Sequence, residues 1–173
     1  VLGYVPKVED LVLESRHLGL VLPGEIESLK EKLNRLADVL EESIDLDAFL
    51  ALAYEAPDFT YETPELPKLS GGKKVRIGVA EDDAFCFTYR DNFQMLKDMG
   101  AELVPFSPIK DEKLPEGVDG LILSGGYPEL HAKALSENED MREAIHDAVK
   151  AGLPCIAECG GFLYLHRTLE GSG

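Results

Sequence analysis

Residues 153–165 read LPCIAECGGFLYL, and this stretch decides the fold of the chain. A short apolar run ends at Cys159, two glycines follow, and an apolar pattern with helical spacing then resumes. This order is typical of a strand, a tight turn and a helix, with a thiol at the turn. The glycines remove the side chains that would clash in such a turn.

The thiol of Cys159 is predicted to be a catalytic nucleophile. Backbone N–H groups at the start of the new helix point at the sulfur and favour the thiolate, which is the reactive form. The alternative is a structural cysteine buried in a strand-to-helix turn. A second stretch favours catalysis, because residues 118–130 read VDGLILSGGYPEL and repeat the order of buried strand, two glycines and helix start with an early proline.

The two glycine loops are expected to lie close together. Parallel strands of one sheet place their C-terminal loops along the same edge, which is where the sites of α/β proteins form. The backbone N–H groups of Gly126 and Gly160 would then make an oxyanion hole for acyl transfer opposite Cys159. Glycine pairs after strands are common, so this prediction depends on the two loops together.

Strands and helices are expected to alternate from residue 75 onward. The expected strands are 75–80, 102–106, 121–124 and 155–158. Capping-box patterns, Asp91 with Gln94 and Ser136 with Glu139, predict helices running to about Met99 and to Lys150. This alternation implies right-handed crossovers and a three-layer α/β fold with a mostly parallel sheet.

Residues 1–19 carry short apolar runs and turns without a clear pattern, and a helical pattern then opens at Pro23-Gly24. Leucines recur at three- and four-residue spacing and predict a helix whose apolar stripe faces a core, at positions 29, 33, 36 and 40. A second helix is expected from Asp47 to about Glu55, with Asp45 or Asp47 as its cap. Residues 57–74 are polar and rich in proline, which predicts a linker between two domains.

Composition argues against several classes of function. With 17 basic and 33 acidic residues the net charge is −16, and such a surface repels nucleic acid. No apolar run reaches the ~20 residues needed to span a bilayer, so no membrane partner is expected. Three cysteines without disulfide spacing indicate free thiols and a cytoplasmic location. No Cys/His cluster has the spacing of a zinc site, and no metal site is predicted.

Four blocks in the same order resemble the cobyrinic acid a,c-diamide synthase family, with similarity from Gly3 to about Leu169. They read ESRHLGLV (14–21), AFCFTYRDN (84–92), SGGYPE (124–129) and AECGGFLYL (157–165). The resemblance implies a class I glutaminase domain of flavodoxin-like fold for residues 75–173. It also implies that residues 1–56 are the helical C-terminal part of an ATP-dependent amidoligase domain.

The resemblance implies a ligase that uses glutamine and ATP to amidate the a and c carboxylates of cobyrinic acid, in cobalamin biosynthesis. ATP and Mg²⁺ would bind in the rest of such an enzyme, together with the corrinoid or related tetrapyrrole acceptor, and no cofactor is expected to bind this chain tightly. Amidation of nickel-sirohydrochlorin on the coenzyme F430 route is an alternative. A non-catalytic glutaminase-like module, a cysteine hydrolase or peptidase, and a homodimeric assembly also stay open.

The resemblance assigns further residues to the site. Tyr127 and Glu129 contact the glutamine or only support the oxyanion loop. Two groups are expected to face the acceptor or the other domain: Tyr89, Asp91 and Asn92 after the first strand, and Arg16 and His17 near the amino terminus. Asp91 has a second interpretation as a helix cap.

The catalytic base is expected outside this chain. In the family, the catalytic histidine follows the cysteine at a distance that lies beyond residue 173. His166 lies ~10 Å along the helix from Cys159, too far to pair with it, and His131 near the second glycine loop is not assigned as the base. We therefore expect the chain to be a fragment that is inactive alone.

Overall fold

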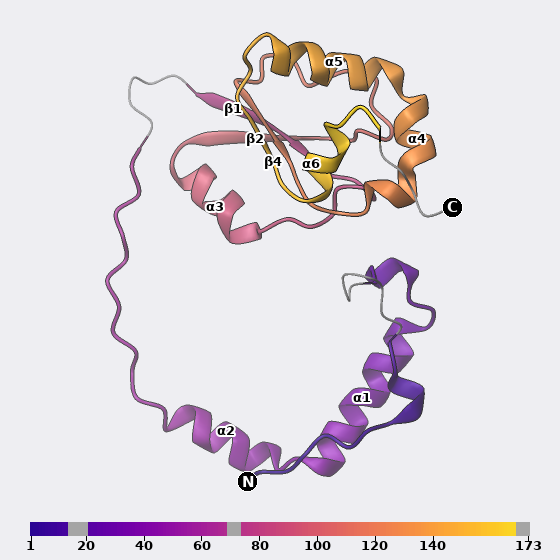
Figure 1. Ribbon diagram of the computed structural model, residues 1–173. Helices are drawn as coiled ribbons and strands as arrows, with labels where there is room; N and C mark the ends of the chain where they lie inside the picture. The colour runs from indigo at the N-terminus through magenta and orange to yellow at the C-terminus, as the bar shows by residue number, and fades with distance from the viewer. Residues whose placement is uncertain (14–20, 69–73, 169–173) are drawn as a thin grey trace. The chain divides into compact units, whose positions relative to one another are not determined.

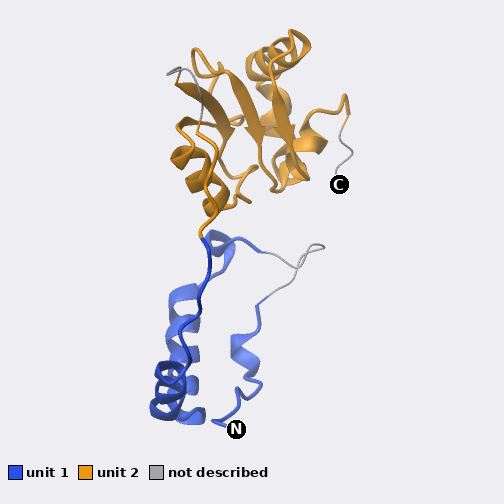
Figure 2. Cartoon of the chain, turned by 90° about the vertical axis from the view of Figure 1, so that its left-hand side faces the viewer, with its two compact units in different colours: residues 1–62 blue, residues 63–173 orange. Residues whose placement is uncertain are grey.

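The computed structural model describes residues 1–13, 21–68 and 74–168. The chain forms two compact units, Val1–Glu62 and Thr63–Gly173, drawn in blue and orange in Figure 2. We call them the amino-terminal unit and the α/β unit.

The α/β unit is built on a four-stranded sheet in which every pair of neighbouring strands is parallel. The strands are β1 (Val75–Ala80), β2 (Ala101–Phe106), β3 (Gly120–Leu123) and β4 (Cys155–Ala157). Their order is β2-β1-β3-β4, which is the order of a flavodoxin-like doubly wound sheet. The predicted α/β fold with a parallel sheet is confirmed.

Helices cover both faces of this sheet (Figure 1). Helix α3 (Arg90–Asp98) connects β1 to β2 and lies on one face. The other face is covered by α5 (Glu139–Lys150), which follows η3 (Pro128–His131) and α4 (Ala132–Glu137). The short helix α6 (Gly160–Tyr164) follows β4 and packs Tyr164 against the core on the α5 side.

The core lies between the sheet and α5. Alternate residues of a strand point to opposite faces, and β3 directs Leu121 and Leu123 into this core. Met141 and Ile145 reach it from α5, and Phe85 closes it from the loop after β1. This packing holds the carboxyl ends of β1, β3 and β4 in fixed relative positions.

The capping box predicted at Ser136 and Glu139 is wrong. Asn138 caps α5 instead, since its side-chain oxygen accepts a hydrogen bond from the Met141 N–H at 3.3 Å. The Ser136 hydroxyl donates to the carbonyl of Lys133, because Ser136 lies inside α4. The sequence pattern did not separate α4 from α5, so the cap was placed too early.

The capping box predicted at Asp91 and Gln94 is also wrong. Helix α3 begins one residue earlier, at Arg90, and the preceding Tyr89 makes no side-chain capping bond. Gln94 donates to Asp98 one turn further along the helix, at 2.8 Å. Both side chains of the proposed box therefore lie within the helix.

The amino-terminal unit contains α1 (Leu29–Ser43), α2 (Leu46–Tyr54) and two single 3₁₀ turns, Glu9–Leu11 and Pro23–Glu25. Both predicted helices are present. Asp45 caps α2 as predicted, by accepting a hydrogen bond from the Ala48 N–H at 2.9 Å. That the amino-terminal unit belongs to an amidoligase domain stays a prediction.

The leucine stripe is only partly covered in the part of this unit that the structure describes, where Leu29, Leu36 and Leu40 are half-buried. There Val39 is the only buried side chain, and Leu33 is 55% exposed. The stripe makes α1 amphipathic, and within the described unit the turn Glu9–Leu11 lies against α1 without fully burying the stripe. No helix in residues 1–13, 21–68 and 74–168 combines the length and apolar character that crossing a membrane requires.

Candidate active site

The turn after β4 holds Cys159 in an unusual backbone conformation. Its φ is 50° and its ψ is −110°, and the residue occupies the N-cap position of α6. Positive φ is rare outside glycine and costs about 1–3 kcal/mol. The residue is exposed, and its carbonyl accepts a hydrogen bond from the Leu163 N–H at 3.0 Å. The predicted turn between strand and helix is therefore present, with the thiol-bearing residue at the surface.

The two glycines after Cys159 are required by close packing. A Cβ built on Gly161 would lie 2.1 Å from the carbonyl oxygen of Leu123 in β3. A Cβ built on Gly160 would lie 2.8 Å from Cδ of Pro128 and 3.0 Å from the amide nitrogen of Gly126. A side chain at either position would push the turn away from the second glycine loop.

The second glycine loop, Gly125–Gly126, lies against this turn. A Cβ built on Gly125 would be 3.6 Å from Cβ of Cys159, and Gly126 contacts Gly160 through backbone atoms. Within the described residues, the N–H groups of Gly126 and Gly160 have no hydrogen-bond acceptor. The structure thus brings together the thiol and the two donors that the sequence analysis selected, while their catalytic roles stay a prediction.

The loop after β1 supports the second glycine loop from behind. The Phe87 N–H donates to the carbonyl of Gly125 at 3.0 Å, and the Phe87 ring packs edge-on against Tyr127 at a centroid distance of 5.2 Å. The carbonyl oxygen of Ala84 would lie 2.1 Å from a Cβ on Gly126. Loops after three strands therefore meet at one point on the carboxyl edge of the sheet.

Tyr127 and Glu129 have different surroundings. The side chain of Tyr127 is only 1% exposed, so its ring lies inside the α/β unit and packs behind the glycine loop. Glu129 is half-buried in η3, directly after the buried Pro128. Of the two, Glu129 is therefore the more accessible to a ligand in this structure.

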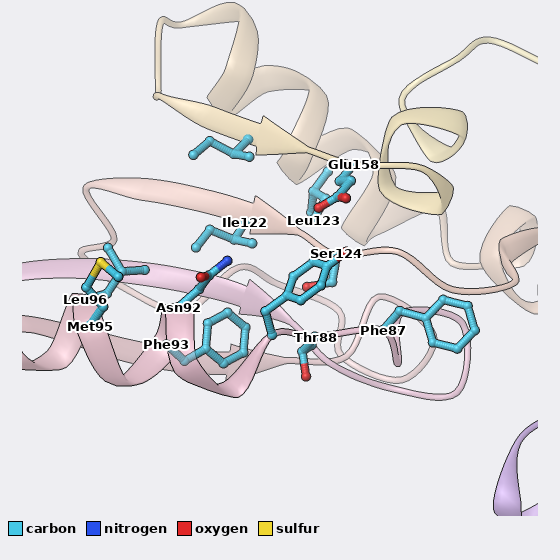
Figure 3. Close-up of a pocket in the computed structure, with 12 residues that line it drawn as sticks. Phe87, Thr88, Asn92, Phe93, Met95, Leu96, Ile122, Leu123, Ser124 and Glu158 are labelled. Carbon is cyan, nitrogen blue, oxygen red and sulfur yellow. The ribbon is translucent and has the colours of Figure 1, made fainter. Parts of the chain in front are cut away.

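A groove of about 290 Å³ runs along the α3 face of the sheet (Figure 3). Tyr89 and Asn92 line it together with Glu158, the residue before the thiol. Its walls are apolar and include Phe93, Leu96, Ile122 and Ile156. Asp91 is exposed in the first turn of α3 and does not line the groove. No sequence motif predicts the groove, although the apolar side chains on the second face of β3 and β4 are a signal for it.

Two histidines and two residues near the amino terminus complete the set that the sequence raised. His166 lies just after α6, where its Nδ1 is 2.9 Å from the Phe162 carbonyl oxygen and its ring packs against the Phe162 ring at a centroid distance of 4.7 Å. His131 ends η3 and is half-buried. Arg16 and His17 lie outside the described residues. Among the residues the structure describes, no group of three or more His, Cys, Asp or Glu side chains is arranged to hold a metal ion.

Cys155 contrasts with Cys159 four residues later. It belongs to β4, is half-buried and packs against the core. Burial raises the pKa of the Cys155 thiol, because a thiolate is disfavoured away from water. Of the two cysteines in this stretch, the exposed one at the turn is therefore the better placed to react.

Comparisons with known proteins point to one family. Residues 76–173 match the family described as the CobB/CobQ-like glutamine amidotransferase domain. The chain is 46% identical over 175 residues to a cobyrinate a,c-diamide synthase of Caldanaerobacter subterraneus, and 44% identical to those of Clostridium acetobutylicum and Thermoplasma volcanium. Each alignment covers 99% of this chain but 37% or 38% of the relative, so the chain spans about two fifths of the length of these curated relatives.

Proposed function

Because the chain belongs to the CobB/CobQ-like glutamine amidotransferase family, we propose that it supplies the glutamine-hydrolysing thiol of a cobyrinate a,c-diamide synthase. One observation carries the proposal. An exposed cysteine on a strained turn lies beside two backbone N–H groups that have no acceptor in the described structure. An acyl-transfer site needs this combination of nucleophile and oxyanion donors.

In the proposed reaction, Sγ of Cys159 attacks the side-chain amide carbon of glutamine. The oxyanion of the tetrahedral intermediate accepts hydrogen bonds from Gly126 and Gly160, and the C–N bond then breaks to release ammonia. Water hydrolyses the resulting thioester and releases glutamate. A histidine supplied by the rest of a full-length enzyme would take the thiol proton and pass it to the leaving ammonia.

The released ammonia is proposed to amidate the a and c carboxylates of a corrinoid, after ATP and Mg²⁺ have activated them elsewhere in the enzyme. Tyr89 and Asn92 would serve the route towards that half of the enzyme, because they line the groove next to Glu158. We also propose that the acceptor or the domain interface is contacted by Arg16, His17 and Asp91. Glu129 is proposed to contact the glutamine, and Tyr127 to support the loop.

The test uses a full-length synthase, meaning a polypeptide of the relatives' length that carries this chain as its matching segment. Cys159→Ser should abolish glutamine-dependent amidation and leave ammonia-dependent amidation intact, since free ammonia bypasses the thioester. Cys155→Ser in the preceding strand β4 is the matched control and should keep both activities. A Cys159→Ser enzyme that still uses glutamine at the parent rate would refute the proposal.

The acceptor is tested separately. Product formation is compared for cobyrinic acid and nickel-sirohydrochlorin, with ammonium salt as the nitrogen source so that the glutaminase does not limit the rate. Faster amidation of nickel-sirohydrochlorin would identify it as the acceptor and assign the enzyme to the coenzyme F430 route. A full-length synthase that amidates either acceptor from ammonia, but hydrolyses no glutamine, would identify the α/β unit as a non-catalytic module.

A further inference from the structure

Asp82, in the loop between β1 and α3, connects two segments of the α/β unit. Its Oδ1 accepts hydrogen bonds from the N–H groups of Ala84 and Phe85, at 2.9 and 3.2 Å. Its Oδ2 accepts from the hydroxyl of Ser107 and the N–H of Ile109, at 2.8 and 2.9 Å. The carboxylate therefore ties the loop after β1 to the connector after β2.

The segment that Asp82 shapes is the one that contacts the oxyanion loop. Ala84 and Phe85 have no exposed surface, so they cannot shift without disturbing the core. The Ala84 carbonyl lies directly against Gly126, and the Phe87 N–H donates to the Gly125 carbonyl at 3.0 Å. A change in the 82–87 segment would therefore move the N–H group of Gly126.

We propose that Asp82 is a positioning residue for glutamine hydrolysis, which rests on the function proposed above. It acts through residues 84–87 on the Gly126 N–H and does not touch the glutamine itself. The oxyanion forms only in the transition state, so a displaced donor lowers kcat and leaves the KM for glutamine nearly unchanged. A residue that only stabilised the fold would instead lower the free energy of unfolding and the fraction of folded enzyme, while each folded molecule kept the parent kcat for glutamine.

Asp111 provides a matched control on the same connector. Its Oδ2 accepts a hydrogen bond from the Ser107 N–H at 2.7 Å, and its carbonyl accepts one from Asn138 at 2.8 Å. None of its hydrogen bonds within the described residues reaches the loop after β1. Asp111→Asn therefore loosens the connector without releasing residues 82–87.

The experiment compares Asp82→Asn and Asp111→Asn in the full-length synthase. An asparagine at 82 keeps one acceptor oxygen, but its amide NH₂ cannot accept the Ile109 N–H. We expect the kcat for glutamine to fall about 10- to 100-fold, as for a misplaced catalytic group, with KM changed by less than about threefold. Ammonia-dependent synthesis and the Asp111→Asn enzyme should stay within about twofold of the parent.

Three results would overturn the inference: a glutamine kcat near the parent value in Asp82→Asn, equal losses in the two variants, or an equal loss with ammonia. If Asp82→Asn does not fold, Ser107→Ala replaces it, since it removes one donor to the carboxylate. Ser107→Ala is expected to lower the glutamine kcat selectively and to a smaller extent, and an unchanged kcat would reject the proposal. Retained glutamine use by Cys159→Ser would instead mean that the proposed function itself has failed.

Discussion

The two units of the chain differ in what covers their apolar side chains. In the α/β unit, nine buried residues form one cluster between the sheet and α5. In the described part of the amino-terminal unit only Val39 is buried, whereas Phe49, Leu52 and Tyr54 of α2 are 54%, 61% and 87% exposed. Both units contain amphipathic or apolar helices, but only one of them has a second layer within the described chain.

This difference shows that an apolar stripe in the sequence can predict a helix without predicting a core around it. Helix formation depends on local features, and residue spacing together with the Asp45 cap was enough to predict α1 and α2. A core depends on a second surface, which a helical stripe does not specify. In the α/β unit the sheet supplies that surface, and the same packing holds the loops around Cys159 in place.

The largest difference between the units is expected for buried side chains. Phe85→Ala in the α/β unit should lower the free energy of unfolding by about 3–5 kcal/mol, because it removes a fully buried ring. Val39→Ala in α1 should cost about 1–2 kcal/mol, since it removes two methyl groups. Denaturant unfolding followed by circular dichroism measures both. A larger cost for Val39→Ala would contradict the contrast between the units.

A glycine pair tests close backbone contact. Gly161→Ala should destabilise the α/β unit by about 1–3 kcal/mol, because the new Cβ meets the Leu123 carbonyl and both backbones must move. Gly24→Ala in the amino-terminal unit has nothing within 4 Å of the new Cβ and should change stability by less than about 0.5 kcal/mol. Thermal unfolding of the two variants measures this difference in stability. Similar shifts in Tm would contradict the role of close backbone contact at Gly161.

Helix caps should show a smaller difference. Asn138 caps α5 and also donates to the carbonyls of Pro108 and Asp111, so Asn138→Ala should cost about 2 kcal/mol. Asp45 caps α2 alone, and Asp45→Ala should cost about 1 kcal/mol. Equal losses in urea unfolding would mean that the two extra bonds of Asn138 contribute nothing net.

The smallest difference is expected at Tyr164, whose buried hydroxyl has no hydrogen-bond partner among the described residues. Tyr164→Phe should change stability at pH 7 by less than about 1 kcal/mol, because no bond is lost. Burial raises the pKa of Tyr164 from 10.0 to about 12 in the folded chain. The folded state then binds the proton more tightly, so stability present below pH 10 is lost as the pH rises towards 12.

The measurement for Tyr164 is the midpoint of urea unfolding at pH 9, 10 and 11. Tyr164→Phe should lose less stability over this range than the parent chain does. Tyr54→Phe in the amino-terminal unit is the control, because that side chain is 87% exposed, and it should follow the parent. The same dependence of the urea midpoint on pH in all three proteins would show that burial of Tyr164 does not raise its pKa.

The parts of the site that sequence could predict are those set by chain order. Two buried runs that end in glycine pairs belong to adjacent parallel strands, and this topology alone brings Gly126 towards Gly160. The role of Asp82 was not predictable, because its partners Ser107 and Ile109 lie 25 and 27 residues away and follow no local pattern. The groove beside α3 likewise depends on how far the sheet face is covered, which spacing along one strand does not specify.

The backbone at Cys159 has a cost in stability. Glycine adopts positive φ without strain, and the ψ of −110° lies outside the left-handed helical region that Ser28 occupies with φ 53° and ψ 34°. Replacement of Cys159 by glycine would therefore relieve about 1–3 kcal/mol of backbone strain. Optimisation of this sequence for thermostability alone would therefore replace Cys159 with glycine. Under the proposed function, position 159 carries a cysteine at a cost in stability because the reaction needs a thiol at this turn.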